Sequence, residues 1–188
     1  MEVGEPNLTS DSILEEIQVE AESMIPTQEE LMGISLHAIM GAPASKTMRL
    51  KGRIHCQTIM VLIDIGSTHS FVDPSIAKKA KLPIIDSQLY VQIANGDNLP
   101  CHGCCKAIPI QLLGFQTKAT LHLLTLGGYL VLGVDWLRQL GPILWNFIDL
   151  TMQFPFNGST IRLQGIRPSE TNLEEEEKIS KCTKYFGE

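Results

Sequence analysis

The chain has 188 residues and a formal net charge of −6 at pH 7, which suits one domain with flanking segments rather than two full domains. Its charge is unevenly distributed: residues 1–48 carry nine acids and one base, residues 49–168 six acids and eleven bases, and residues 169–188 six acids and three bases. We therefore expect a domain over residues 47–165, an acidic and largely disordered linker over residues 1–46, and an acidic disordered or helical tail over residues 166–188.

Two classes of partner are not indicated by this composition. The longest uncharged stretch, residues 119–134, is 16 residues long and contains Gly127 and Gly128, so it is too short and too interrupted to span a membrane. The basic body has neither a zinc knuckle nor basic residues interleaved with aromatic ones, and we expect no nucleic-acid binding by this domain.

The five cysteines are an odd number in a chain without a signal peptide, which predicts reduced thiols in the cytoplasm. Cys101 and Cys104 form a Cys-x-x-Cys pair, a spacing found in metal sites, and His102 lies next to Cys101. A tetrahedral zinc site needs four ligands, usually from two separated pairs, and no second pair exists. We expect neither a metal nor another cofactor, and we interpret these residues as part of a sheet.

The first predicted elements are two strands and a short helix. Residues 50–56 alternate apolar and polar side chains, as in a half-exposed strand, and residues 58–63 form a continuous apolar run typical of a buried strand. Asp73 followed by Pro74 is a helix-start signal, which predicts a short helix over residues 75–81 with Asp73 as its cap.

The following elements are again mostly strands. Asn95-Gly96 predicts a hairpin of residues 90–93 with residues 99–103. Further strands are expected over residues 107–113, 117–124, 129–132, 143–147, 150–154 and 160–163, with a turn at Asn157-Gly158. A short helix is expected over residues 134–140, with Asp135 as its cap and Trp136 in the core. This pattern predicts an all-β domain, a closed barrel or sandwich with one or two short helices.

The candidate catalytic residue is Asp64, which ends the apolar run and precedes a Gly-Ser-Thr turn. A carboxylate at the end of a buried strand is energetically costly, because burial disfavours its charged form. A residue retained at such a cost indicates a chemical function. The turn hydroxyls and backbone N–H groups favour that charged form. Such a balance is typical of carboxylates that act in acid/base catalysis.

Residues 47–165 resemble the retropepsin-type aspartic protease of plant Ty3/gypsy long-terminal-repeat retrotransposons. The likeness rests on residues 48–52, on Leu-Ile-Asp-Ile-Gly-Ser-Thr-His-Ser-Phe-Val at residues 62–72, on residues 91–103, and on Leu-Val-Leu-Gly-Val-Asp-Trp-Leu at residues 130–137. Residues 140–154 resemble the segment that leads from protease toward reverse transcriptase in those polyproteins.

The resemblance implies a homodimeric aspartic endopeptidase that cleaves a polypeptide substrate during polyprotein processing. Each chain would supply one catalytic residue, Asp64, and the two carboxylates would share a proton. It also implies a set of supporting residues: an active-site loop of Ile65, Gly66, Ser67 and Thr68, a substrate-binding flap of Ile93, Ala94, Asn95, Gly96 and Asp97, and structural support from Leu132 and Gly133.

Ile65 departs from the family, which has Thr or Ser at this position, with a hydroxyl that bonds across the two-fold axis. Isoleucine can neither donate nor accept a hydrogen bond. Each buried group left unpaired costs about 1–3 kcal/mol, and the two-fold symmetry doubles the loss. We therefore expect a weak dimer and weak or absent cleavage.

Two other functions fit parts of the sequence. A catalytically degenerate retropepsin fold could serve as a dimerisation or peptide-binding module. Asp-Ile-Gly-Ser-Thr also resembles the first phosphate loop of actin-like ATPases, in which an isoleucine after the aspartate is ordinary. That fold needs a second such loop and a much longer chain, and neither is visible here.

Overall fold

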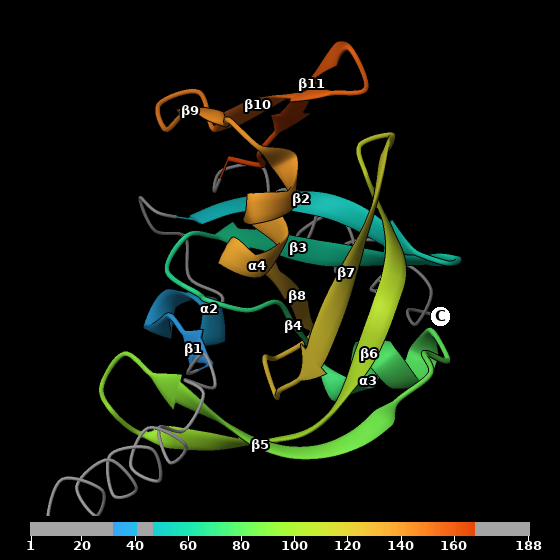
Figure 1. The fold of residues 1–188 in the computed structure, drawn as a ribbon, viewed down its shortest axis with the longest axis vertical. Coiled ribbons are helices and arrows are strands. Elements are labelled where there is room, and N and C mark those ends of the chain that lie inside the picture. Colours follow the sequence, from blue (N-terminus) through green and yellow to red (C-terminus); the bar gives the residue numbers. More distant parts are fainter. Residues whose placement is uncertain (1–31, 41–46, 168–188) are drawn as a thin grey trace, which may run out of the picture. The chain divides into compact units, whose positions relative to one another are not determined.

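The computed structural model describes residues 32–40 and 47–167, which form a mostly β domain (Figure 1). Residues 1–31, 41–46 and 168–188 lie outside the described residues. Most of the expected linker and most of the expected tail therefore lie outside them too, and the domain boundaries stay predictions.

Six strands close into a barrel, in the order β6, β2, β3, β8, β4, β7 and back to β6. β5 and β1 extend the same sheet from β6. The strands are β1 (Gly33–Ile34), β2 (Thr47–Ile54), β3 (Gln57–Asp64), β4 (Phe71–Val72), β5 (Ile85–Ile93), β6 (Asn98–Leu112), β7 (Phe115–Leu123) and β8 (Tyr129–Leu132). The all-β fold expected from the sequence is confirmed, and of the two expected forms, barrel or sandwich, it is the closed barrel.

β3 carries the catalytic candidate and is buried on both faces. Val61 and Ile63 belong to the larger apolar cluster, and Leu62 belongs to a second one with Phe71 and Val131. β3 pairs with β2 on one side and with β8 on the other. This explains why its sequence is continuously apolar rather than alternating.

Short helices fill the connections. α3 (Pro74–Lys79) and α4 (Val134–Leu137), which continues into the 3-10 turn η1 (Arg138–Leu140), lie where short helices were expected. Trp136 is fully buried. Asp135 is not the expected cap, because Gly133 occupies the N-cap position. The Asp135 carboxylate instead accepts hydrogen bonds from Trp136 N at 2.7 Å and from Ser70 Oγ at 2.6 Å.

Asp73 caps α3 as expected, with its carboxylate accepting hydrogen bonds from Ser75 N and Leu126 N, each at 2.9 Å. Burial alone would raise the pKa of Asp73, but hydrogen bonds from Ser75, Leu126 and Gly128 together hold it below its usual value.

These bonds predict a loss of stability in acid. The unfolded chain binds the Asp73 proton more readily than the folded chain does, so the stabilisation is present above about pH 4 and is lost as the pH falls through the lowered folded pKa. We expect Asp73→Asn to lower the free energy of unfolding at pH 7 and to flatten its decrease below about pH 4, as measured by urea denaturation. An equally steep acid limb in Asp73→Asn would contradict this assignment.

The hairpin expected around Asn95-Gly96 forms between β5 and β6, with Tyr90 opposite Pro100 and Gln92 opposite Asn98. Gly96 has φ of 93°, a conformation that favours glycine. The expected strands over residues 99–103 and 107–113 are one strand, β6, with an irregularity between Cys105 and Ile108. β6 thus belongs to both the hairpin and the barrel.

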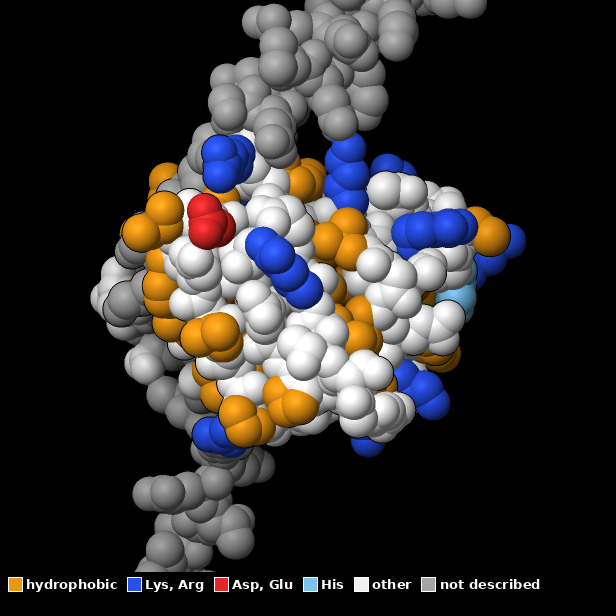
Figure 2. All heavy atoms as spheres, turned by 90° about the horizontal axis from the view of Figure 1, so that it is seen from above, with side chains coloured by type: hydrophobic (Ala, Val, Ile, Leu, Met, Phe, Trp, Pro, Cys, Tyr) orange, Lys and Arg blue, Asp and Glu red, His pale blue; other side chains and the backbone are white. Residues whose placement is uncertain are grey.

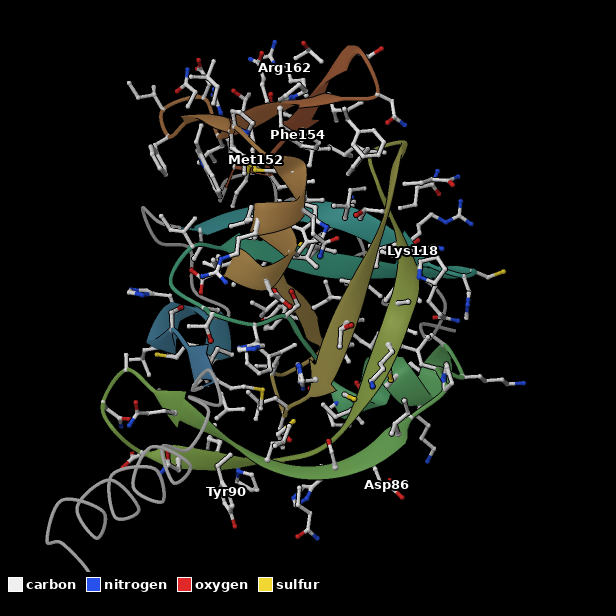
Figure 3. All side chains as sticks on the ribbon, viewed as in Figure 1. Asp86, Tyr90, Lys118, Met152, Phe154 and Arg162 are labelled. Carbon is white, nitrogen blue, oxygen red and sulfur yellow. The ribbon has the colours of Figure 1, made fainter. Side chains whose placement is uncertain are left out.

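A separate sheet follows the barrel and consists of β9 (Leu144–Asn146), β10 (Thr151–Phe156) and β11 (Ser159–Gln164). Met152 and Phe154 are buried in the larger apolar cluster, whereas Arg162 lies on the outer side of the sheet (Figure 3). The view onto this sheet shows apolar side chains interspersed with Lys and Arg (Figure 2). The turn expected at Asn157-Gly158 joins β10 to β11.

Residues 32–40 differ from the linker expected there, because they form β1 and α2 (Leu36–Met40). Met32, Ile34 and Ala38 are buried in the second apolar cluster. β1 pairs in parallel with the end of β5. The acidic composition of residues 1–46 had indicated a solvated chain. Burial of these apolar side chains instead stabilises residues 32–40 against the domain.

Candidate active site

Asp64 is the last residue of β3, and its side chain is only 1% exposed. The loop that follows satisfies both carboxylate oxygens: Gly66 N donates to Oδ1 at 3.2 Å, and Ser67 Oγ donates to Oδ2 at 2.6 Å. Each carboxylate oxygen therefore has a hydrogen-bond donor from the same loop. The chain thus holds an acidic group in a fixed position at the end of a buried strand.

Gly133 lies directly against the backbone of this loop. A Cβ atom at Gly133 would lie 2.3 Å from the carbonyl oxygen of His69 and 2.7 Å from that of Ser67. Val134 N donates to Ser67 O at 2.9 Å, and Asp135 N donates to Thr68 O at 3.0 Å. Only glycine permits this approach, because the opposing atoms are backbone and cannot rotate away.

Leu132 lies where the sequence predicted structural support. It is fully buried and pairs with Ile63 across the parallel β3–β8 ladder. Since Ile63 immediately precedes Asp64, this pairing fixes the end of the strand that presents the carboxylate. The roles of Leu132 and Gly133 stay predictions.

Ser70 is a supporting residue that the sequence did not single out. It is fully buried; its Oγ donates to Asp135 Oδ1 at 2.6 Å and accepts from Gly133 N at 3.1 Å. The hydroxyl therefore ties the end of the active-site loop to the start of α4. No local sequence signal reports this contact, because Ser70 and Asp135 are 65 positions apart.

Two histidines, His69 and His122, lie near Ser70 and Asp135. The rings of His69 and His122 meet edge to face with centroids 5.6 Å apart. Burial lowers the pKa of His122, the nearby His69 lowers it further, and Asp135 opposes both effects. His122 Nδ1 is buried without a hydrogen-bond partner. We therefore expect a neutral His122 at pH 7.

Ile65 is 41% exposed, although it directly follows the buried Asp64. An apolar side chain at the surface of a loop is available to another molecule, whereas its backbone remains part of the turn. Gly66 and Thr68 are also exposed, and Ser67 is buried.

The predicted flap residues lie in the β5–β6 hairpin. Ile93 is half-buried at the end of β5, and Ala94, Asn95, Gly96 and Asp97 form the exposed turn. The turn is closed by Gly96 N donating to Ile93 O at 2.8 Å and by Asp97 N donating to Asn95 Oδ1 at 3.0 Å. Between the turn end of this hairpin, at Gln92 and Ile93, and the active-site loop runs β1, a neighbour that the sequence did not predict.

A cavity of about 610 Å³ lies apart from the predicted site residues. It is lined by residues of β2, β6, β7 and the C-terminal elements, among them Arg53, Lys118 and Phe156. Within residues 32–40 and 47–167, no three His, Cys, Asp or Glu side chains gather in a way that could bind a metal ion. None of the helices described has the length and apolar composition needed to cross a bilayer.

Comparison with known proteins bears on the same region. The family model described as "Retroviral aspartyl protease" matches residues 45–144, more than half of the chain. Among solved structures, the chain is similar to the retroviral protease-like domain of Ddi1 from Leishmania major, with 12% identity, a TM-score of 0.49, and coverage of 65% of this chain and 95% of that one. A comparison with curated proteins found no match.

Proposed function

Because the chain belongs to the retroviral aspartyl protease family, we propose that it is an aspartic endopeptidase subunit that cleaves peptide bonds as a homodimer. The observation that carries this proposal is the Asp64 carboxylate, buried at the end of β3 and hydrogen-bonded by Gly66 N and Ser67 Oγ. The family match includes this loop, which favours the aspartic protease over the ATPase alternative.

The need for two chains follows from the chemistry. Two adjacent carboxylates cannot both be ionised, so they share one proton. The ionised one activates water, and the protonated one donates to the carbonyl oxygen of the scissile bond. Asp-x-Gly occurs once in the 188 residues, at residues 64–66. A second copy of the chain would therefore supply the second carboxylate.

The β5–β6 hairpin would close over the bound peptide. Its turn is exposed, and the end of β5 that leads into the turn pairs with β1, which is hydrogen-bonded to the active-site loop. A hairpin in this place can exclude water and supply backbone hydrogen bonds to an extended substrate. We assign Ile93, Ala94, Asn95, Gly96 and Asp97 to this role.

The second candidate function is a non-catalytic dimerisation or peptide-binding module. Ile65 favours it, because the exposed apolar side chain lacks the hydroxyl that would stabilise the paired loops. The two candidates differ in one measurable property, which is peptide cleavage that depends on Asp64.

We also propose that the chain is part of a retrotransposon polyprotein of the Ty3/gypsy kind and acts in the cytoplasm. Support comes from the resemblance of residues 140–154 to the protease–polymerase junction of such polyproteins. Cys56, Cys101, Cys104 and Cys105 are free thiols, as in a reducing compartment.

The test is cleavage of an apolar peptide substrate at mildly acid pH. We expect cleavage that is weak, is inhibited by pepstatin and is absent in Asp64→Asn, because the dyad needs an ionisable group on each chain. Sedimentation of both proteins at the assay concentration checks that they are dimers. Equal cleavage by Asp64→Asn would overturn the assignment, and a dimer without cleavage would favour the non-catalytic module.

A further inference from the structure

Residues 32–35, called here the resident segment, run extended between the two halves of the proposed peptide-binding site. On one side, β1 pairs in parallel with β5, with Gly33 opposite Gln92 and Ile34 opposite Ile93. Gln92 N also donates to Met32 O at 2.8 Å. Figure 1 shows β1 next to the end of β5, which leads into the hairpin turn.

On its other side the resident segment bonds to the active-site loop. Thr68 N donates to Gly33 O at 2.9 Å, and Gly33 N donates to Thr68 Oγ1 at 2.7 Å. The segment therefore binds as an added strand, through main-chain hydrogen bonds on both sides. Proteins often bind extended peptides in this way.

Ile34 supplies the side-chain part of this binding. It is 2% exposed and belongs to the second apolar cluster, together with Phe71, Val91 and Val131. Without the resident segment, these apolar side chains would border the space between the hairpin and the loop. Such a pocket would favour an apolar residue in any peptide that replaced the segment.

Ser35 connects the resident segment to the active-site loop by a hydrogen bond. Ser35 N donates to Ser67 Oγ at 3.2 Å, and that same hydroxyl donates to Asp64 at 2.6 Å. The Ser35 Cβ atom lies 3.0 Å from the position that a Cβ on Gly66 would take. The segment thus occupies space directly beside the carboxylate.

The chain does not continue as an extended peptide past this point. Ser35 Oγ accepts from Ala38 N at 3.1 Å, and α2 begins at Leu36. A protease that grips an extended backbone on both sides of the scissile bond would not find that geometry at residues 35–36. The segment therefore has the features of a bound ligand rather than of a substrate in position for cleavage.

We infer that residues 32–35 occupy the peptide-binding groove of their own subunit, so that an apolar extended peptide binds only when this segment is displaced. The inference rests on the proposed function, since it identifies the groove of the protease with the space beside Asp64. A peptide and the resident segment would compete for the same two donors, Thr68 N and Gln92 N. Binding of the segment in cis, at high effective concentration, would suppress peptide binding.

The test measures binding alone, in the full chain carrying Asp64→Asn. The probe is a fluorescent peptide with the sequence of residues 30–36, Glu-Leu-Met-Gly-Ile-Ser-Leu, and the readout is anisotropy. Gly33→Pro removes the N–H that bonds to Thr68 Oγ1, and we expect it to raise peptide affinity about tenfold. Gly33→Ala is the matched control, because its Cβ would meet Thr68 Cγ2 at an ordinary 3.6 Å, and we expect unchanged affinity.

A second variant, Ile34→Ala, keeps the backbone and partly empties the apolar pocket, so it too should raise affinity for the probe. A probe with Asp in place of its Ile should bind none of the chains. Equal affinity of the unmodified and Gly33→Pro chains, or binding to neither Gly33→Pro nor Ile34→Ala, would overturn the inference. Failure of the proposed function appears separately, as absence of cleavage when Asp64 is present.

Discussion

Gly133→Ala is expected to lower the free energy of unfolding by about 3 kcal/mol, the upper part of the range for overpacked sites. Its Cβ would lie 2.3 Å from His69 O and 2.7 Å from Ser67 O, so the active-site loop and α4 must move apart. That movement also separates Val134 N and Asp135 N from their loop acceptors. Urea denaturation monitored by tryptophan fluorescence gives the change in free energy.

Gly33→Ala is the control for this substitution, since it adds the same methyl group at a position where the new Cβ would make only ordinary van der Waals contacts. We expect it to change the free energy of unfolding by less than about 0.5 kcal/mol. If Gly133→Ala and Gly33→Ala were equally stable, the close approach of loop and glycine would not exist in solution.

Ile65→Thr is expected to tighten the homodimer about 30-fold and to raise peptide cleavage at subunit concentrations near the dissociation constant. The hydroxyl would supply a hydrogen bond across the two-fold axis from each loop. At about 1 kcal/mol for each group satisfied, two loops give about 2 kcal/mol, which corresponds to that factor. Sedimentation measures the dimer, and initial rates over a range of subunit concentrations measure the activity.

Ile65→Val is the matched control, because valine has the shape of threonine without its hydroxyl. We expect Ile65→Val to resemble the unmodified chain in both measurements. If the Val and Thr chains dimerise and cleave alike, the missing hydroxyl does not limit this protein, and Ile65 would be an ordinary interface residue.

The elements with local signals were predicted from the sequence. The apolar run that ends at Asp64, the Asn95-Gly96 turn, the Asp73 cap and the Asn157-Gly158 turn each depend on residues within a few positions of one another. Local patterns of this kind report backbone geometry directly. Many short strands favoured a barrel or a sandwich, and only the pairing of β6 with β7 shows that the sheet closes into a barrel.

The features that depend on distant contacts could not be predicted. Asp135 has the local appearance of a helix cap, but its carboxylate binds Ser70 and the Gly133 backbone occupies the cap position. β1 consists of two residues, and its stability comes from pairing with β5 about 60 positions later. The strands predicted over residues 99–103 and 107–113 are one strand, since β6 continues through an irregularity between Cys105 and Ile108, where Ala107 has a φ of 51°. That continuity depends on pairing with β7 rather than on local sequence.

The central claim is that each chain contributes one Asp64 to a shared active site, and mixing of subunits tests it most directly. A chain that keeps Asp64 and a chain with Asp64→Asn, both carrying Ile65→Thr, are mixed in varying ratios at constant total concentration, and their subunits are allowed to exchange. If cleavage requires both carboxylates, the rate follows the square of the Asp64 fraction and falls to about a quarter in an equal mixture. A linear decrease to about half would show that each Asp64 acts independently of the partner chain, and a decrease to only about three quarters would show that one Asp64 per dimer is sufficient. Either result would contradict the account.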